Sequence, residues 1–257
     1  MLADREAGVR RSGRQPSRLN SATTANLTPV PRETVNDRVY GELRRALIKG
    51  LFDPGQVLTI QELATTLETS TMPVREALSR LISEQGLEAM PNRSVRVPPV
   101  DATRLEDLLQ ARIVIEGATL AMAAPRLSSP DLDELELLVR RHEAQPRAPG
   151  AIDLQLELNQ TFHFHIYQAS GSTVMIPIIE SLWLQSGPYI RAAAMAFDPN
   201  SEISTSHFHA KIVGALRAND VPAAQAALAA DIGRAFDLLR DRQRGVETRA
   251  PQAGAAR

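Results

Sequence analysis

The stretch STMPVREALSRLISEQGL, residues 70–87, has the pattern of a short amphipathic helix that carries arginine on one side. Ser70 suits the cap position, and Pro73 fixes φ in the first turn, where its missing N–H costs little. Apolar side chains recur at helical spacing and define an inward face: Val74, Ala77, Leu78, Leu81 and Ile82. The opposite face then presents polar side chains to solvent: Thr71, Arg75, Ser79 and Arg80.

The residues around this stretch extend it to a winged helix-turn-helix over residues 33–100. A helix is predicted over 33–52, and the turn signal Asp53-Pro54-Gly55 follows it. TIQELATTL, residues 59–67, has a capping box and is separated from the arginine-bearing helix only by a short turn, which is helix-turn-helix spacing. After it, LEAM (87–90) and VRVP (95–98) read as two short strands joined by the turn PNRS.

A helix N-terminus with threonine and arginine suits the major groove of DNA. The helix dipole favours phosphate, and arginine pairs with the O6 and N7 atoms of guanine. The predicted DNA-contacting residues are those of the outward face and two arginines of the wing: Thr71, Arg75, Ser79, Arg80, Arg93 and Arg96. The alternative is that these arginines are ordinary solvated charges, because helical pairs with short turns also occur in proteins that do not bind DNA.

Composition limits the other possibilities. The chain has 257 residues, a net charge of −1 and no cysteine, which excludes disulfides, thiolate nucleophiles and cysteine-ligated zinc, and is typical of a reducing cytosol. The sequence has no run of about 18 apolar residues, so no membrane span is predicted. Nearly all basic residues are arginine, which suits phosphate and guanine contacts but also reflects high genomic GC content. Any DNA binding must therefore come from a local basic surface, and we expect a cytoplasmic, nucleoid-associated protein without a membrane partner.

Two tails flank a helical second half. Residues 1–32 carry six arginines and two acidic residues, with no apolar periodicity, and are predicted to be a disordered basic tail; a transit peptide or a tail without function are alternatives. Residues 101–243 contain about six helical segments and no strand pattern, with Asp101 and Ser129 as caps of the first two. Residues 244–257 are predicted to be a frayed tail. The predicted fold class is mainly α, with a winged helix-turn-helix followed by an all-helical bundle.

The segment from Gly50 to Val97 resembles the DNA-binding domain of GntR-family transcription regulators. Its most specific element is PVREALSRLISEQGL, residues 73–87. The resemblance implies operator binding as a dimer, with Arg75 and Arg80 among the DNA contacts. Two positions depart from the family pattern: Thr71 stands where an arginine is usual, and Ser94 where a wing glycine is usual.

The helical half is similar to the FCD-type effector domain of the FadR subfamily. Three segments carry this resemblance: ARIVIEGATLAMAA (111–124), LNQTFHFHIYQASGS (158–172) and HAKIVGALRANDVPAAQAALAADI (209–232). Six helices rather than seven favour the VanR-like branch. Many such domains hold a divalent metal, and the corresponding positions here are Asn159, His163, His209 and Asp231.

The metal set departs from the family pattern of one aspartate and three histidines, since Asn159 replaces the aspartate and Asp231 the last histidine. Asn159 and His163 are four residues apart and share a helix face. The resulting imidazole, carboxylate and amide donors favour zinc, with nickel or manganese as alternatives. A lone buried histidine is more often a hydrogen-bonded core group, and that alternative stays open. His165 and His207 are out of phase with the candidate ligands and are expected to point elsewhere.

Arg112 lies one turn before Glu116, so the two side chains form either a solvated ion pair or part of a cavity. The resemblance implies that Arg112 faces the cavity and meets the carboxylate of a small effector, with Arg191 as a second cavity residue.

The sequence thus predicts a ligand-responsive regulator, a repressor, that binds DNA as a homodimer. One alternative is a DNA-binding dimer whose helical domain holds no metal and serves dimerisation or metal-free ligand binding. Another is a metal-dependent enzyme, although the sequence offers no obvious additional general base.

Overall fold

A computed structural model describes residues 34–91, 94–146, 149–196 and 205–249, with 241–249 described by their backbone only. Residues from Val35 onward belong to one compact unit. The predicted basic tail (1–32) and the wing residue Arg93 lie outside the described residues. No helix in the described ranges is both long enough and apolar enough to cross a membrane.

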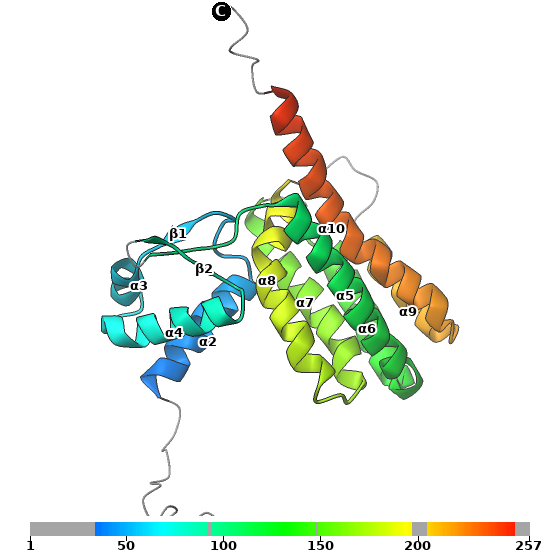
Figure 1. The fold of residues 1–257 in the computed structure, drawn as a ribbon. Helices are drawn as coiled ribbons and strands as arrows, with labels where there is room; N and C mark the ends of the chain where they lie inside the picture. The colour runs from blue at the N-terminus through cyan, green and yellow to red at the C-terminus, as the bar shows by residue number, and fades with distance from the viewer. Residues whose placement is uncertain (1–33, 92–93, 147–148, 197–204, 250–257) are drawn as a thin grey trace, which may run out of the picture. The chain divides into compact units, whose positions relative to one another are not determined.

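The first part of the described chain has the predicted order of three helices and a hairpin (Figure 1). The helices are α2 (Val35–Ile48), α3 (Ile60–Thr66) and α4 (Thr71–Ser83). The strands β2 (Glu88–Ala89) and β3 (Val95–Arg96) pair antiparallel, as expected for a wing. A third strand, β1 (Val57–Leu58), was not predicted and pairs with β3, so that the strand order is β1-β3-β2.

Helix α2 ends earlier than the Asp53-Pro54-Gly55 turn that was expected to stop it. The backbone N–H of Gly50 donates to the carbonyl of Leu47, and that of Leu51 donates to Ala46. Gly50 has a φ of +65°, a left-handed conformation that glycine adopts without strain. These two bonds form a Schellman motif, which ends the helix at its own C-terminus rather than at the following turn.

Local hydrogen bonds and a small apolar core hold the helix-turn-helix in place. The side chain of Thr59 accepts a hydrogen bond from the backbone N–H of Glu62 and caps α3. Ser70 is the N-cap residue of α4 as predicted, although its side chain makes no capping bond. The predicted inward face of α4 is buried at Val74, Ala77, Leu78 and Leu81, whereas Ile82 is half-buried.

The described residues of the second part form six α-helices, the number predicted for this region, and two short 3-10 segments at Ala124–Arg126 and Pro149–Ala151. They are α5 (Ala102–Ala123), α6 (Ser129–Glu143), α7 (Ile152–Ala169), α8 (Met175–Met195), α9 (Thr205–Arg217) and α10 (Val221–Arg249). Helices α5, α7 and α8 pack on one another, and α10 packs along α5, α8 and α9 (Figure 1). Helix α10 continues to Arg249, so a tail beginning at residue 244 is wrong; arginine, glutamine and glutamate there favour helix.

Helix α8 contributes side chains to both apolar cores. Trp183 and Tyr189 belong to the core of the helical part, whereas Leu184 is buried among the residues of the winged part. At Gly187 the backbones of α8 and α2 come so close that a Cβ atom would lie 2.2 Å from the carbonyl oxygen of Leu47. Glycine is therefore required at this crossing.

Candidate functional site

The outward face of α4 is the candidate DNA interface. Arg75, Ser79 and Arg80 are exposed and Thr71 is half-buried, which is the orientation that the apolar spacing predicted. Pro73 and Val74, which directly precede Arg75, lie on the inner face, where they are buried and fix this orientation. Within the described residues Arg75 has no ion-pair partner, so its guanidinium is available for a base or a phosphate.

The other predicted DNA-contacting arginines of the described chain have protein partners. The guanidinium of Arg80 lies 3.7 Å above the ring of Tyr40 and donates a hydrogen bond to Glu84 at 3.2 Å. Arg96 donates to Glu88 across the wing at 2.7 Å. Both arginines are therefore already oriented by neighbours, and a DNA contact by Arg96 requires it to share or leave Glu88.

The helical part contains a cavity of about 540 Å³. All six of its helices contribute to the walls, among them Arg112 from α5, His142 from α6, Ser206 from α9 and Asp231 from α10. Apolar side chains also line the cavity, among them Ile152, Leu156, Ile190 and Leu238. Small-molecule sites combine apolar side chains with converging polar groups in this way.

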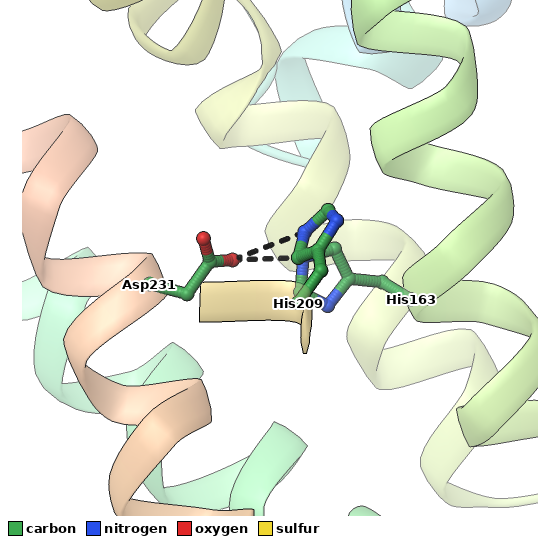
Figure 2. A group of neighbouring side chains, drawn as sticks. All are labelled: His163, His209 and Asp231. Carbon is green, nitrogen blue, oxygen red and sulfur yellow. Dashed lines mark hydrogen bonds and ion pairs between the residues drawn. The ribbon is translucent and has the colours of Figure 1, made fainter. Parts of the chain in front are cut away.

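Three of the four predicted metal ligands, His163, His209 and Asp231, come together (Figure 2), and His163 and Asp231 also line this cavity. The Oδ2 atom of Asp231 lies 3.0 Å from Nε2 of His163 and 3.6 Å from Nε2 of His209. Ligand atoms around a tetrahedral zinc ion are separated by about 3.3 Å, given metal–ligand bonds near 2.0–2.1 Å. The two measured separations lie on either side of this value, and the three ligand atoms all lie within 4.8 Å of one another. Asn159, the fourth predicted ligand, lies one turn before His163 and lines the same cavity.

The environment of the His209 ring also fits a bound cation. A separation of 3.6 Å is too long for a hydrogen bond, and Nε2 of His209 is buried without a hydrogen-bond partner. Phe162 stacks on the His209 ring, with 4.0 Å between the ring centroids, and holds its orientation. Buried polar atoms without partners are rare in native proteins and indicate an ion or ligand.

The directions of the pKa shifts of His209 and Asp231 suit metal ligands. Burial lowers the pKa of His209, which keeps its imidazole neutral. Burial raises the pKa of the Asp231 carboxyl, but His209 and His163 outweigh burial and hold that pKa well below its usual range. An ionised carboxylate and a neutral imidazole are the forms that coordinate a metal.

Sequence reasoning missed His142, which lines the cavity from α6. Its Nδ1 atom is buried without a hydrogen-bond partner, and its ring centroid lies 5.7 Å from that of His209. Burial, followed by the nearby His209, lowers the pKa of His142 to about 4. A signal was present, because Leu135, Leu138 and Val139 define the inward face of α6 and residue 142 is the next position on it.

Arg112 and Glu116 form an ion pair that is buried rather than solvated. The Nε atom of Arg112 donates to Glu116 at 2.6 Å, and the side chains are 3% and 0% exposed. Tyr167 and Trp183 also donate to Glu116, at 2.5 Å and 3.3 Å. Arg112 also lines the cavity. It therefore both pairs with Glu116 and faces the cavity, the two alternatives that its position in the sequence left open.

Other predicted positions lie away from the cavity. Arg191 is not among the described residues that line it, and its guanidinium instead donates to Asp153 at 2.5 Å. Its assignment as a second cavity residue is therefore not supported by the geometry. His165 pairs with Asp131 at 3.6 Å and His207 is exposed, so both point elsewhere, as their spacing predicted.

A winged helix joined to a cavity-bearing helical bundle defines a DNA-binding regulator, and comparison with known proteins specifies the family. The gntR family of bacterial regulatory proteins matches residues 35–97, and the FCD domain matches residues 107–234. The HTH-type transcriptional regulator McbR of Escherichia coli (strain K12) is 32% identical over 187 residues, covering 71% of this chain and 82% of McbR. The HTH-type transcriptional repressor GlaR of the same organism is 27% identical over 149 residues, covering 56% of this chain and 67% of GlaR.

Solved structures agree with these sequence matches. E. coli McbR/YncC has a TM-score of 0.73 at 27% identity, covering 82% of this chain and 100% of that chain. A GntR structure from Rhodococcus sp. RHA1 has a TM-score of 0.64 at 23% identity, covering 80% and 97%, and supports the fold. The chain therefore belongs to the GntR family of transcription regulators, with a winged helix-turn-helix domain and an FCD effector domain.

Proposed function

We propose that this regulator is a repressor that binds its operator as a homodimer and responds to a small organic acid. The observation that carries the proposal is that Arg112, His163 and Asp231 line one cavity, and that His209 joins His163 and Asp231 in a cluster of possible metal ligands. Arginine and a divalent metal are the two groups that bind carboxylates most strongly in proteins. The apolar side chains of the cavity lining would take the hydrocarbon part of such an acid.

The metal would be held by His163, His209 and Asp231, with the amide oxygen of Asn159 as a further donor. Two imidazoles with oxygen donors suit zinc, and nickel and manganese are the alternatives. A bound divalent cation would supply positive charge for an anionic effector. The protein's own residues would orient the effector in the cavity and exclude water from it.

DNA recognition would use the outward face of α4, with Arg75 and Arg80 reaching base edges and Thr71 and Ser79 near the phosphates. Two-fold symmetric half-sites in the operator would match the two winged domains of a dimer. A protein that binds such operators would act on the nucleoid in the cytoplasm. Effector binding would change the affinity for DNA only if α4 is placed differently in the effector-free and the effector-bound protein. Helix α8 is the candidate link, because it contributes to both apolar cores.

The experiment is elemental analysis and native mass spectrometry of the purified full chain, followed by gel-shift titration on DNA selected from a random pool. One metal ion per chain with a retained small acid, and release of DNA when that acid is added, supports the proposal. No metal and no effect of acids on DNA binding supports a helical domain that only dimerises. Turnover of a candidate acid would reveal a metal-dependent enzyme instead.

A further inference from the structure

The carboxylate of Glu116 is fully buried and receives hydrogen bonds from three different side chains. Arg112 donates to its Oε1 atom, and Tyr167 and Trp183 donate to its Oε2 atom. An ionised carboxylate only accepts hydrogen bonds. The single hydroxyl proton of Tyr167 is therefore committed to Glu116, across a distance of 2.5 Å.

The same hydroxyl oxygen lies 3.2 Å from Nδ1 of His163. Because its proton points to Glu116, the Tyr167 oxygen can only accept a hydrogen bond from His163. His163 must then carry a proton on Nδ1. Tyr167 follows His163 by four residues on α7, so one helix face presents both groups and fixes their contact.

A proton on Nδ1 leaves Nε2 of His163 as the atom that faces Asp231, at 3.0 Å. A lone pair and a carboxylate oxygen at this distance repel each other unless a proton or a metal cation lies between them. The position where that cation would lie also faces the unpartnered Nε2 of His209. The chain of contacts from Arg112 thus ends at the proposed metal position.

We infer that Tyr167 is a positioning residue of the metal site, and that it connects the Arg112–Glu116 pair to His163. It fixes the Nδ1-protonated form of the His163 ring, so that Nε2 is the ligand atom. An acid that binds Arg112 competes with Glu116 for the same guanidinium, and the effect passes through Tyr167 to the metal. This inference rests on the proposed function, and it adds a residue that is not one of the ligands.

The test compares full-length wild type with Tyr167→Phe, which keeps the ring and removes only the hydroxyl. Zinc alone is the probe, and its affinity is measured by competition with a chelator of known affinity. Loss of a hydrogen-bond partner to a metal-bound histidine weakens metal binding by about 10- to 100-fold. We expect that loss in Tyr167→Phe. In the metal-free protein, nitrogen-15 NMR of this variant should lack the hydrogen-bonded Nδ1–H signal that the His163 ring gives in the wild type.

Tyr189→Phe is the matched control, because Tyr189 is also a buried tyrosine of the bundle but donates to the carbonyls of Pro98 and Pro99. It should leave zinc affinity and the His163 signals unchanged. Equal zinc affinity in Tyr167→Phe and wild type would overturn the inference. If wild type binds no zinc, the metal part of the proposed function fails, and NMR of the metal-free protein decides on Tyr167: an unprotonated Nδ1 overturns its role, whereas an Nδ1–H lost in Tyr167→Phe supports it.

Discussion

The Nε2 atom of His163 on α7 lies 3.0 Å from the Oδ2 atom of Asp231 on α10, although 68 residues separate them in sequence. Both side chains are buried and line the cavity of the helical part. His163 also contacts Tyr167, and through it the Arg112–Glu116 pair. Ligand, metal and fold stability are therefore expected to be linked in this protein.

Replacement of the proposed ligands should remove the metal. We expect His163→Ala and His209→Ala each to lose bound metal after dialysis, because each removes a nitrogen donor from a site with few other donors. Metal content per chain by elemental analysis is the measurement. The matched controls are His165→Ala and His207→Ala, neighbours on the same helices that point elsewhere; stoichiometric metal in the ligand variants would exclude this site.

Arg75→Ala should weaken DNA binding by about 10- to 100-fold, since one arginine–guanine contact contributes about 1–3 kcal/mol to discrimination. The measurement is a gel-shift titration on selected DNA at fixed salt. Arg141→Ala, which removes an exposed arginine of α6, is the control for net charge. An unchanged affinity in Arg75→Ala would refute a role for Arg75 in DNA recognition.

Arg112→Met should destabilise the fold by about 3–5 kcal/mol, because it leaves the buried Glu116 carboxylate without its counter-charge. Urea unfolding of the metal-free protein measures the change. The double variant Arg112→Met with Glu116→Gln should recover much of the loss, because the neutral amide still accepts from Tyr167 and Trp183. Equal destabilisation in the single and double variants would indicate lost packing rather than an unpaired charge.

The metal-free protein should lose stability as pH falls from 6.5 toward 4. His142 has a pKa lowered from 6.5 to about 4 in the folded state, so between these values the unfolded chain binds more protons. The contribution of neutral His142 to the free energy of unfolding is fully present above pH 6.5. It is lost as pH falls through the folded-state pKa, and the loss is at most about 3 kcal/mol. His209, whose pKa burial also lowers, acts in the same direction.

The measurement is the free energy of unfolding against pH in the presence of a chelator. His142→Gln, which cannot titrate, should flatten the slope in this window. The depressed pKa of Asp231 takes effect only at lower pH and does not mask the result. An identical slope in the variant would show that His142 is not held in its neutral form.

Local patterns were enough to predict much of the DNA-binding part. The spacing of Val74, Ala77, Leu78 and Leu81 determined which face of α4 is buried, because helical periodicity depends only on neighbouring residues. Cap positions were less certain. Asp101 caps α5 as predicted, but Ser128 rather than Ser129 caps α6, since its side chain and Asp131 form a reciprocal capping box.

The sequence by itself determined the order of helices and wing, through helical spacing and turn signals. Its motifs also carried the family resemblance, and that resemblance implied the candidate ligands His163, His209 and Asp231. Only the tertiary structure decided that His142 joins their cavity, that Arg191 lies outside it, and that Tyr167 connects Glu116 to His163. Each of these depends on which helices pack together and how they are rotated. Packing of distant segments sets those rotations, and no local pattern of residues records them.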